Sequence, residues 1–162
     1  MTIAIRPATA ADEDAVWGIL EAIVRAGDSF TNDPGSSRAE VLATWEGAAT
    51  LNYVAELDGE IAGAYLVRPV QTGLGSHIAN ASFAVGPNAR GHGVGRAMGE
   101  HAIAEAKRLG FRAMQFNAVV STNERAIALW KSLGFEEVGR IPEAFHLNRE
   151  RHVDTLVMFR KL

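Results

Sequence analysis

The residues best suited to chemistry form a glycine-rich run, Arg90-Gly91-His92-Gly93-Val94-Gly95. Glycines at this spacing let main-chain N–H groups approach a ligand closely, because no Cβ atom stands in the way. A helical pattern begins directly after the run, and the first turn of a helix adds unpaired N–H donors and a partial positive charge. The combination favours a pyrophosphate ligand, with Arg90 as a further cation.

Two common phosphate-binding motifs do not fit this run. A P-loop requires Lys and then Ser or Thr after its last glycine, but Arg96 follows Gly95. A dinucleotide-binding G-x-G-x-x-G motif that starts at Gly91 or Gly93 lacks the glycine at its sixth position. An R-x-x-G-x-G pattern does fit, with Arg90 as its first residue, and a glycine-rich turn without a ligand is the alternative.

The R-x-x-G-x-G pattern resembles the acyl-coenzyme A motif of the GCN5-related N-acetyltransferases, the GNAT superfamily. A second segment, Asn123 to Phe135, is similar to the family's N-x-x-A-x-x-L-Y-x-x-x-G-F segment. The two segments have the order and spacing of the family, with a strand-like run between them. The chain is therefore identified as a member of this superfamily.

Composition limits the other possibilities. The chain has 162 residues, 48% hydrophobic and 22% charged, which indicates one globular domain over residues 1–162. The net charge of −3 and the lack of a basic run argue against nucleic acid, and no apolar run is long enough to span a membrane. Without cysteines, disulfides, thiolate metal sites and a cysteine acyl-enzyme are excluded. The N-terminus is not a secretion signal, so we expect a cytoplasmic protein.

Hydrophobic periodicity predicts strands and helices in an alternating order. An Asp58-Gly59 pair predicts a hairpin between the second and third strands. The predicted strands are residues 2–7, 51–57, 61–70, 77–85, 113–120, 135–141 and 153–162. The predicted helices are residues 12–25, 37–48, 93–109 and 121–133, with loops at 27–37 and 142–151. The resemblance implies an α/β (α+β) GNAT fold, a mixed and mostly antiparallel sheet of about seven strands, splayed between the fourth and fifth, with about four helices.

Local signals predict three helix ends. Thr9 and Asp12 have the spacing of a cap before the first helix, and Ser121 and Glu124 have the spacing of a capping box. Gly134 is expected to end the last helix in a left-handed conformation, with Phe135 folded back onto the helix.

The resemblance assigns the acetyl-CoA site. It implies that the pantetheine arm lies in the gap between the fourth and fifth strands and pairs with the fourth like an added strand. Backbone N–H groups near Val85 would also stabilise the oxyanion of the reaction. The residues implied to bind acetyl-CoA are Phe83, Ala84, Val85, Arg90, Gly91, His92, Gly93, Val94, Gly95, Arg96, Asn123 and Trp130. Asn123 could instead be a simple cap residue.

Trp130 departs from the family pattern. It occupies the helix position that usually holds tyrosine, the acid that protonates the leaving thiolate. An indole N–H can donate a hydrogen bond but has no proton to give at neutral pH. Trp130 could therefore contact the sulfur or simply belong to the core.

The general base is also not evident. Neither the fourth nor the fifth predicted strand carries a carboxylate, whereas relatives often have a glutamate on the fourth. His77 has a suitable intrinsic pKa but lies at the start of its strand, where a surface role is the alternative. A chain of water molecules could remove the ammonium proton instead.

Two asparagines are the candidate acceptor-binding residues. Asn80, with Ser82 on the same face, and Asn117 interrupt strands that flank the expected cleft, although asparagine is disfavoured in strands. They could bind the acceptor or brace the splayed strands. Their segments also resemble a subgroup of the family that acetylates proline-like cyclic amino acids. Loop residues placed where relatives shape the acceptor pocket are Phe30, Thr31, Asn32, His146 and Asn148.

The resemblance implies transfer of an acetyl group from acetyl-CoA, without a metal, to the amine of a small molecule. The acceptor is expected to be an amino acid or related amine that attacks directly in a ternary complex. A protein N-terminal or lysine acetyltransferase is one alternative, for which the loop at 142–151 could close the site. A non-catalytic acyl-CoA-binding regulatory module is another, motivated by Trp130 and the missing carboxylate. A homodimer is a further expectation, since many relatives pair.

Overall fold

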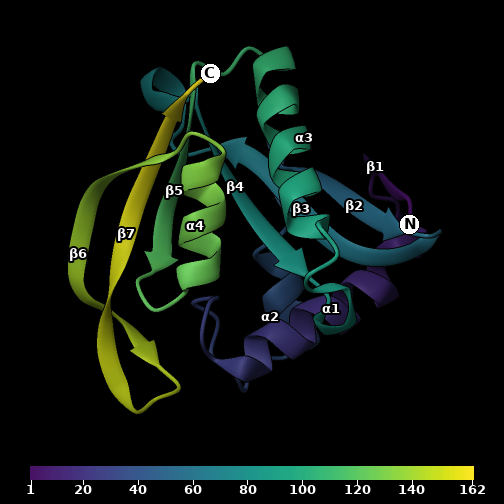
Figure 1. Ribbon diagram of the computed structural model, residues 1–162, viewed down its shortest axis with the longest axis horizontal. Coiled ribbons are helices and arrows are strands. Elements are labelled where there is room, and N and C mark those ends of the chain that lie inside the picture. Colours follow the sequence, from purple (N-terminus) through teal and green to yellow (C-terminus); the bar gives the residue numbers. More distant parts are fainter.

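A computed structural model describes all residues, 1–162, and contains one seven-stranded sheet with the order β1-β2-β3-β4-β5-β7-β6. Only the β4–β5 pair is parallel, and all the other neighbours are antiparallel. The sheet therefore confirms the mixed, mostly antiparallel architecture (Figure 1). The strands are β1 (Ile3–Pro7), β2 (Leu51–Leu57), β3 (Glu60–Pro69), β4 (Ile78–Val85), β5 (Ala113–Val120), β6 (Glu136–Leu147) and β7 (Arg151–Lys161).

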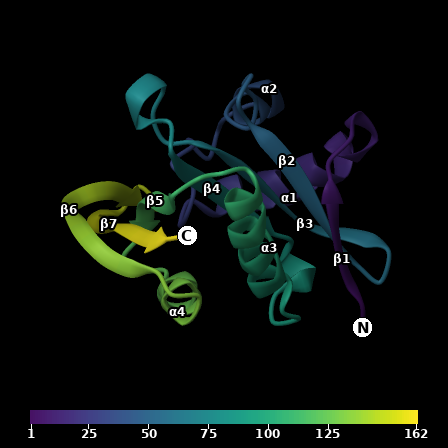
Figure 2. The ribbon, with the colours of Figure 1, turned by 90° about the horizontal axis from the view of Figure 1, so that it is seen from above.

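Helices cover both faces of the sheet, as the view from above shows (Figure 2). The helices are α1 (Glu13–Ala26), α2 (Arg38–Ala43), α3 (Val94–Arg108) and α4 (Glu124–Ser132). One buried cluster joins α1 and α2 to alternate residues of β2, β3 and β4. A larger cluster joins α3 and α4 to the other face of the same strands and of β5 and β7. None of the helices is long and apolar enough to cross a membrane.

The sheet opens between β4 and β5. Their pairing is limited to Ile78 with Ala113 and Ala79 with Met114, whereas β3 stays paired with β4 as far as Val85. Beyond Ala79 the two strands diverge (Figure 1), and β5 bends away where its register against β7 shifts after Phe116. One edge of β4 is thus free of a neighbouring strand over most of its length.

A polar network fixes α3 against the sheet. The Tyr53 hydroxyl donates to Glu105 at 2.6 Å, and the Arg108 guanidinium donates to the same carboxylate at 2.9 and 2.6 Å. The Tyr53 ring stacks on that of Tyr65, with centroids 4.8 Å apart. The hydrogen bonds from Arg108 and Tyr53 lower the pKa of Glu105 from 4.5 to about 2, and burial together with Glu105 raises the pKa of Tyr53 to about 12. This network holds the helix whose first turn borders the open gap.

We expect Glu105→Gln to alter how stability depends on pH. Because the folded-state pKa of Glu105 lies below 4.5, its stabilising contribution is present above about pH 4.5 and is lost as pH falls toward 2. The difference in free energy of unfolding between wild type and Glu105→Gln should therefore be largest near neutral pH and shrink at acid pH. Urea titrations at several pH values measure it, and a difference that does not change with pH would contradict the assignment.

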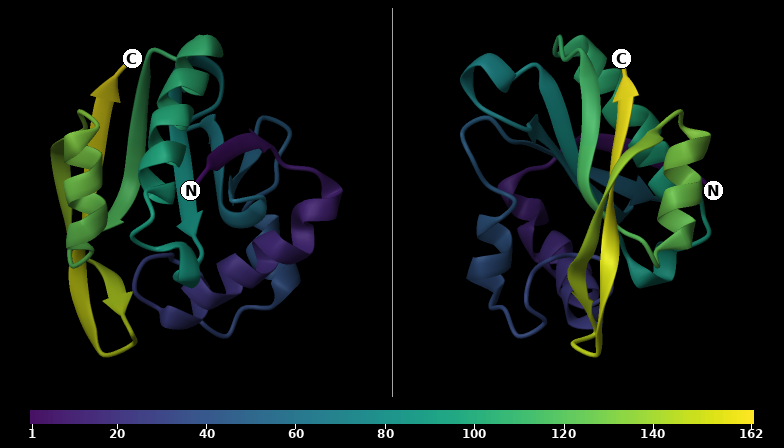
Figure 3. Two further views of the ribbon diagram at one scale, coloured as in Figure 1. Left: turned by 45° about the vertical axis from the view of Figure 1, so that its right-hand side comes forward. Right: turned by 90° about the vertical axis from the view of Figure 1, so that its left-hand side faces the viewer.

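The sequence prediction of a loop at 142–151 is wrong. Strand β6 continues through Pro142 to Leu147, and only a tight turn separates it from β7. Proline is tolerated here because β6 is an edge strand, and a bulge between Ile141 and Phe145 absorbs the irregularity. The resulting β6–β7 hairpin extends beyond the end of α4 (Figure 3).

Two helix predictions also need correction. Helix α2 ends at Ala43 rather than at 48, because Trp45 turns its ring into the core. The predicted capping box of Ser121 and Glu124 is wrong, since the Ser121 N–H is bound to the carbonyl of Asp154 in β7 and Asn123 is the N-cap of α4. The cap between Thr9 and Asp12 is confirmed by a 2.7 Å bond from the Thr9 N–H to the Asp12 carboxylate.

The predicted end of the last helix is confirmed. Gly134 has a φ of +87°, and the Phe135 N–H donates to the Trp130 carbonyl at 3.0 Å. Phe135 is buried against Phe116, with ring centroids 4.4 Å apart.

Candidate functional site

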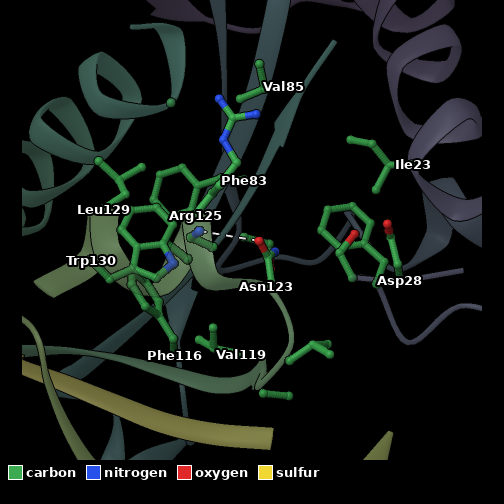
Figure 4. A pocket seen from close by; sticks show the side chains of 18 of the residues that line it. Ile23, Asp28, Phe83, Val85, Phe116, Val119, Asn123, Arg125, Leu129 and Trp130 are labelled. Carbon is green, nitrogen blue, oxygen red and sulfur yellow. Dashed lines mark hydrogen bonds between the residues drawn. The ribbon is translucent and has the colours of Figure 1, made fainter. Parts of the chain in front are cut away.

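A cavity of about 850 Å³ passes through the gap between β4 and β5 and reaches both faces of the sheet. Its first half lies between the glycine-rich run, the start of α3 and the start of α4. Its second half is bordered by the loop between α1 and α2 and by the inner ends of β3 and β4. Figure 4 shows the side chains that meet there. We call these the cofactor half and the acceptor half.

The glycine-rich run presents a set of unused donors. Of the main-chain N–H groups from Gly91 to Arg96, that of His92 alone has an acceptor in the protein, the Ala89 carbonyl at 3.4 Å. The N–H groups of residues 91, 93, 94, 95 and 96 are bound to no protein atom, and the Ala97 N–H returns to the helix ladder at Gly93. This donor set fits the oxygens of a pyrophosphate. His92 itself does not line the cavity, which corrects its predicted role.

Backbone conformation explains why two of these residues are glycines. Gly91 and Gly93 have φ values of +81° and +82°, a region that side chains rarely adopt. A Cβ at Gly91 would meet no protein atom within 4 Å, and one at Gly93 would meet only Ile3, at 4.0 Å. The glycines therefore leave space toward the cavity. A Cβ at Gly95 would lie 3.6 Å from Leu129 of α4.

Two arginines border the donor set. Arg90 is exposed at the start of the run. Arg96 donates to the Ser132 hydroxyl at 2.8 Å and lies 3.7 Å from Glu100, so its guanidinium links α3 to the end of α4. Both place positive charge on the cofactor half, where a pyrophosphate would need it.

The free edge of β4 carries the predicted strand-like site. The Gly86 N–H donates to Ala62 and the Val70 N–H donates to Ile78, both at 2.8 Å, so even-numbered peptide groups of β4 face β3. Peptide groups alternate along a strand, so those of Phe83 and Val85 face the gap. Ala84 differs from prediction, because its side chain is buried against α1 and it does not line the cavity.

Asn123 serves both functions considered for it. Its Oδ1 accepts from the Ala126 N–H at 3.3 Å, which caps α4. Its amide nitrogen has no partner in the protein, and the side chain lines the cavity between the two halves (Figure 4). The cap fixes the rotamer and leaves the NH₂ group available to a ligand.

Trp130 belongs to the core and to the cavity wall at once. Only 7% of the residue is exposed, and its ring lies 4.8 Å from that of Phe83 and 4.6 Å from that of Phe116. The indole N–H has no acceptor in the protein, and the side chain lines the cavity beside Leu129 (Figure 4). The aromatic cluster therefore holds a free donor at the wall of the gap.

The two asparagines lie on the acceptor side of the sheet. Asn80 is half-buried, and its Nδ2 donates to the Gln115 carbonyl at 3.0 Å, which braces β4 against β5 where their ladder stops. Its Oδ1 accepts no hydrogen bond from the protein. Asn117 is exposed, contrary to the expected buried amide, because β5 bulges there, and its Oδ1 accepts from Gln115 Nε2 at 2.8 Å. Both line the cavity together with Ser82.

These positions predict different results for the two alanine variants. Asn80→Ala should lose the brace and cost about 1 kcal/mol of stability as well as lowering kcat/KM for the acceptor. Asn117→Ala should leave the melting temperature unchanged and raise only the acceptor KM. Thermal unfolding and steady-state kinetics separate the two effects. If both variants keep the acceptor KM of wild type, neither asparagine contacts the acceptor.

Several predicted residues do not reach the cavity. His77 is exposed and lies outside it, as do His146 and Asn148. His146 faces away on β6, stacked on His152 with centroids 4.4 Å apart. The Asn148 N–H donates to the carbonyl of Gly27 at 3.0 Å, so the hairpin turn is tied to the end of α1 instead of shaping the pocket.

The acceptor half contains residues that sequence reasoning missed. Phe30, which was predicted together with Thr31 and Asn32, lies 6.3 Å from the ring of Trp45. Arg68 of β3 donates to the Thr44 carbonyl at 3.1 Å and also lines the cavity. Asp28 lines it from the loop after α1. The only sequence signal for the last two was a charge next to an apolar element.

Comparison with known proteins agrees with this geometry. The model of the acetyltransferase (GNAT) family matches residues 20–135. The N-acetyltransferase aca1 of Schizosaccharomyces pombe is 38% identical over 96 residues, which are 59% of this chain and 46% of that protein. The chain thus spans about half the length of this curated relative.

Solved structures match over nearly the whole chain. A GCN5-related N-acetyltransferase from Kribbella flavida is 41% identical, with a TM-score of 0.92 over 99% of this chain and 98% of that one. A GNAT superfamily phosphinothricin acetyltransferase from Sinorhizobium meliloti, solved with acetyl-CoA, is 28% identical, with a TM-score of 0.87 over 100% of this chain and 89% of that one. The open gap, the unused donors and these matches together establish that the chain belongs to the GNAT family of acetyltransferases.

Proposed function

We propose that the protein transfers an acetyl group from acetyl-CoA to the amine of a small molecule. The observation that carries this proposal is the juxtaposition of five unused N–H groups at residues 91 and 93–96 with the free edge of β4. A pyrophosphate and an amide-bearing pantetheine arm are bound by these two features in sequence. The acetyl-CoA bound to the Sinorhizobium meliloti relative supports the choice of donor.

The residues of the chain then act by positioning. Bound acetyl-CoA supplies a thioester, and a neutral amine attacks its carbonyl carbon, so that a C–N bond forms and the C–S bond breaks. The Val85 N–H, which faces the gap, donates to the carbonyl oxygen as negative charge develops on it. Such a donor is worth on the order of 10²–10³ in rate. The proton lost by the attacking nitrogen and the one gained by the thiolate balance.

Trp130 replaces an acid by a hydrogen-bond donor. Its unpaired N–H stabilises the sulfur as the thiolate leaves, without transferring a proton. An ordinary thiol has a pKa near about 8.5, so a thiolate can leave and be protonated by solvent. The amine loses its ammonium proton through water, because neither β4 nor β5 offers a carboxylate.

The proposed acceptor is an amino acid or related amine. The acceptor half is small, with apolar walls from Ile23, Phe30 and Trp45 and amide groups from Asn80 and Asn117. The phosphinothricin acetyltransferase among the relatives supports a small acceptor. We further propose that the protein acts in the cytoplasm.

A thiol-release assay tests the proposal. Purified protein with acetyl-CoA is offered free amino acids, polyamines, aminoglycosides and an array of peptides. The proposal predicts turnover of a small amine and none of peptides. Turnover of peptides alone would instead establish a protein acetyltransferase, and tight acetyl-CoA binding without thiol release from any amine would establish a non-catalytic module.

We also propose that two copies pair. Strand β6 is an edge strand of twelve residues with few buried side chains. Val138 and Ile141 on this strand are 58% and 49% exposed, although both are large and apolar. Unpaired edges of this kind are commonly covered by another chain.

A further inference from the structure

Asp28 is the single acidic residue that lines the cavity. Every other charged residue of its lining is an arginine: Arg68, Arg90, Arg96 and Arg125. The arginines of the glycine run and of α3 lie where a pyrophosphate would need them. One negative charge in a wall that is otherwise neutral or positive is a point of attraction for a cation.

The fold directs Asp28 to the acceptor half. Helix α1 ends at Ala26, and Gly27 reverses the chain with a left-handed φ of +68°. Asp28 then lies beside Ile23, on the far side of the cavity from Trp130 and with Asn123 between them (Figure 4). It therefore borders the space that an acceptor would occupy rather than the cofactor half.

The carboxylate of Asp28 has no partner within the protein, unlike the other acid of the same loop. Asp33 accepts from the Gly35 N–H at 2.7 Å and from Arg149 at 2.6 Å, so it is engaged in holding the loop to the β6–β7 hairpin. Asp28 takes part in no hydrogen bond or ion pair. Arg68, the nearest positive charge in the acceptor half by position in the fold, already donates to Thr44.

We propose that Asp28 is the counterion that recognises the acceptor as an ammonium. The inference rests on the proposed function and defines its acceptor as a cationic amine on an apolar body. When acetyl-CoA and the acceptor fill the cavity, water is displaced and the charge-assisted hydrogen bond from the ammonium to Asp28 becomes stronger. Asp28 acts in binding, before the ammonium loses its proton to water.

Matched ligands that differ only in charge test the inference. The amino acid that gives the fastest thiol release is compared with its 2-hydroxy acid, in which a hydroxyl replaces the ammonium, as a competitive inhibitor. Wild type should prefer the ammonium form. Asp28→Asn should abolish this preference and lower kcat/KM by about 10- to 100-fold, mainly through KM. The Kd of acetyl-CoA should not change, and Asp28→Glu should retain part of the preference.

Asp33→Asn is the matched control, because it makes the same charge change in the same loop outside the cavity. It should keep the preference for the ammonium form even if the loop is loosened. A preference that survives in Asp28→Asn would show that this carboxylate is only solvated, which overturns the inference but leaves the proposed function standing. Absence of thiol release by wild type with every amine would overturn the proposed function itself, and Asp28 recognition with it.

Discussion

Replacing Gly93 by aspartate is expected to weaken acetyl-CoA binding by about 100-fold or more, a loss of about 3 kcal/mol. The new carboxylate would lie among the unused N–H groups at residues 93–96, where it would repel the pyrophosphate and compete for the donors. A Cβ at this position meets no protein atom closer than 4.0 Å, and aspartate tolerates the left-handed region better than most residues. The protein should therefore still fold. Titration calorimetry with acetyl-CoA measures the loss.

Gly110→Asp is the matched control. Gly110 has a φ of +87°, close to that of Gly93, and a Cβ there meets nothing within 4 Å, but it lies at the other end of α3. The two variants should lose similar stability, and only the one at Gly93 should lose acetyl-CoA affinity. Wild-type affinity in Gly93→Asp would rule out the glycine-rich run as the pyrophosphate site.

Trp130→Ala is expected to remove about 3–5 kcal/mol from the free energy of unfolding, because a buried indole packed between Phe83 and Phe116 would leave a cavity. Trp130→Phe should retain most of this stability and lower kcat by up to about tenfold, since it removes only the free N–H donor. Urea unfolding and single-turnover rates measure the two effects separately.

Phe135→Leu provides the comparison for packing alone. Phe135 is 3% exposed and stacks on Phe116, but it does not line the cavity. Its replacement should lower stability while kcat stays at the wild-type value. If Trp130→Phe also keeps the full kcat, the indole contributes to the core and not to the reaction.

The elements predicted best were those with strong local signals. Gly134 and Phe135 fixed the end of α4, and the Asp58-Gly59 pair placed the β2–β3 turn. The extension of β6 through Pro142 was missed because proline ordinarily argues against a strand, and nothing local reveals that this one lies at an edge. The early end of α2 depends on Trp45 entering the core, which is a tertiary effect.

The cofactor half of the site could be predicted, and the acceptor half could not. Phosphate binding by a glycine-rich run and a helix start is encoded within a few consecutive residues, so Gly91 and Gly93 carry the signal themselves. The acceptor half brings together Asp28, Arg68 and Asn117 from three separate elements. Whether such side chains face a cavity depends on where the strands splay and bulge, and no short sequence pattern records that.

A crystal structure of the protein with acetyl-CoA tests the central claim most directly. We expect pyrophosphate oxygens at about 3 Å from the main-chain nitrogens of Gly91, Gly93 and the first turn of α3, and the pantetheine arm along the free edge of β4. Acetyl-CoA bound with its pyrophosphate anywhere else, and these N–H groups facing only solvent, would contradict the account.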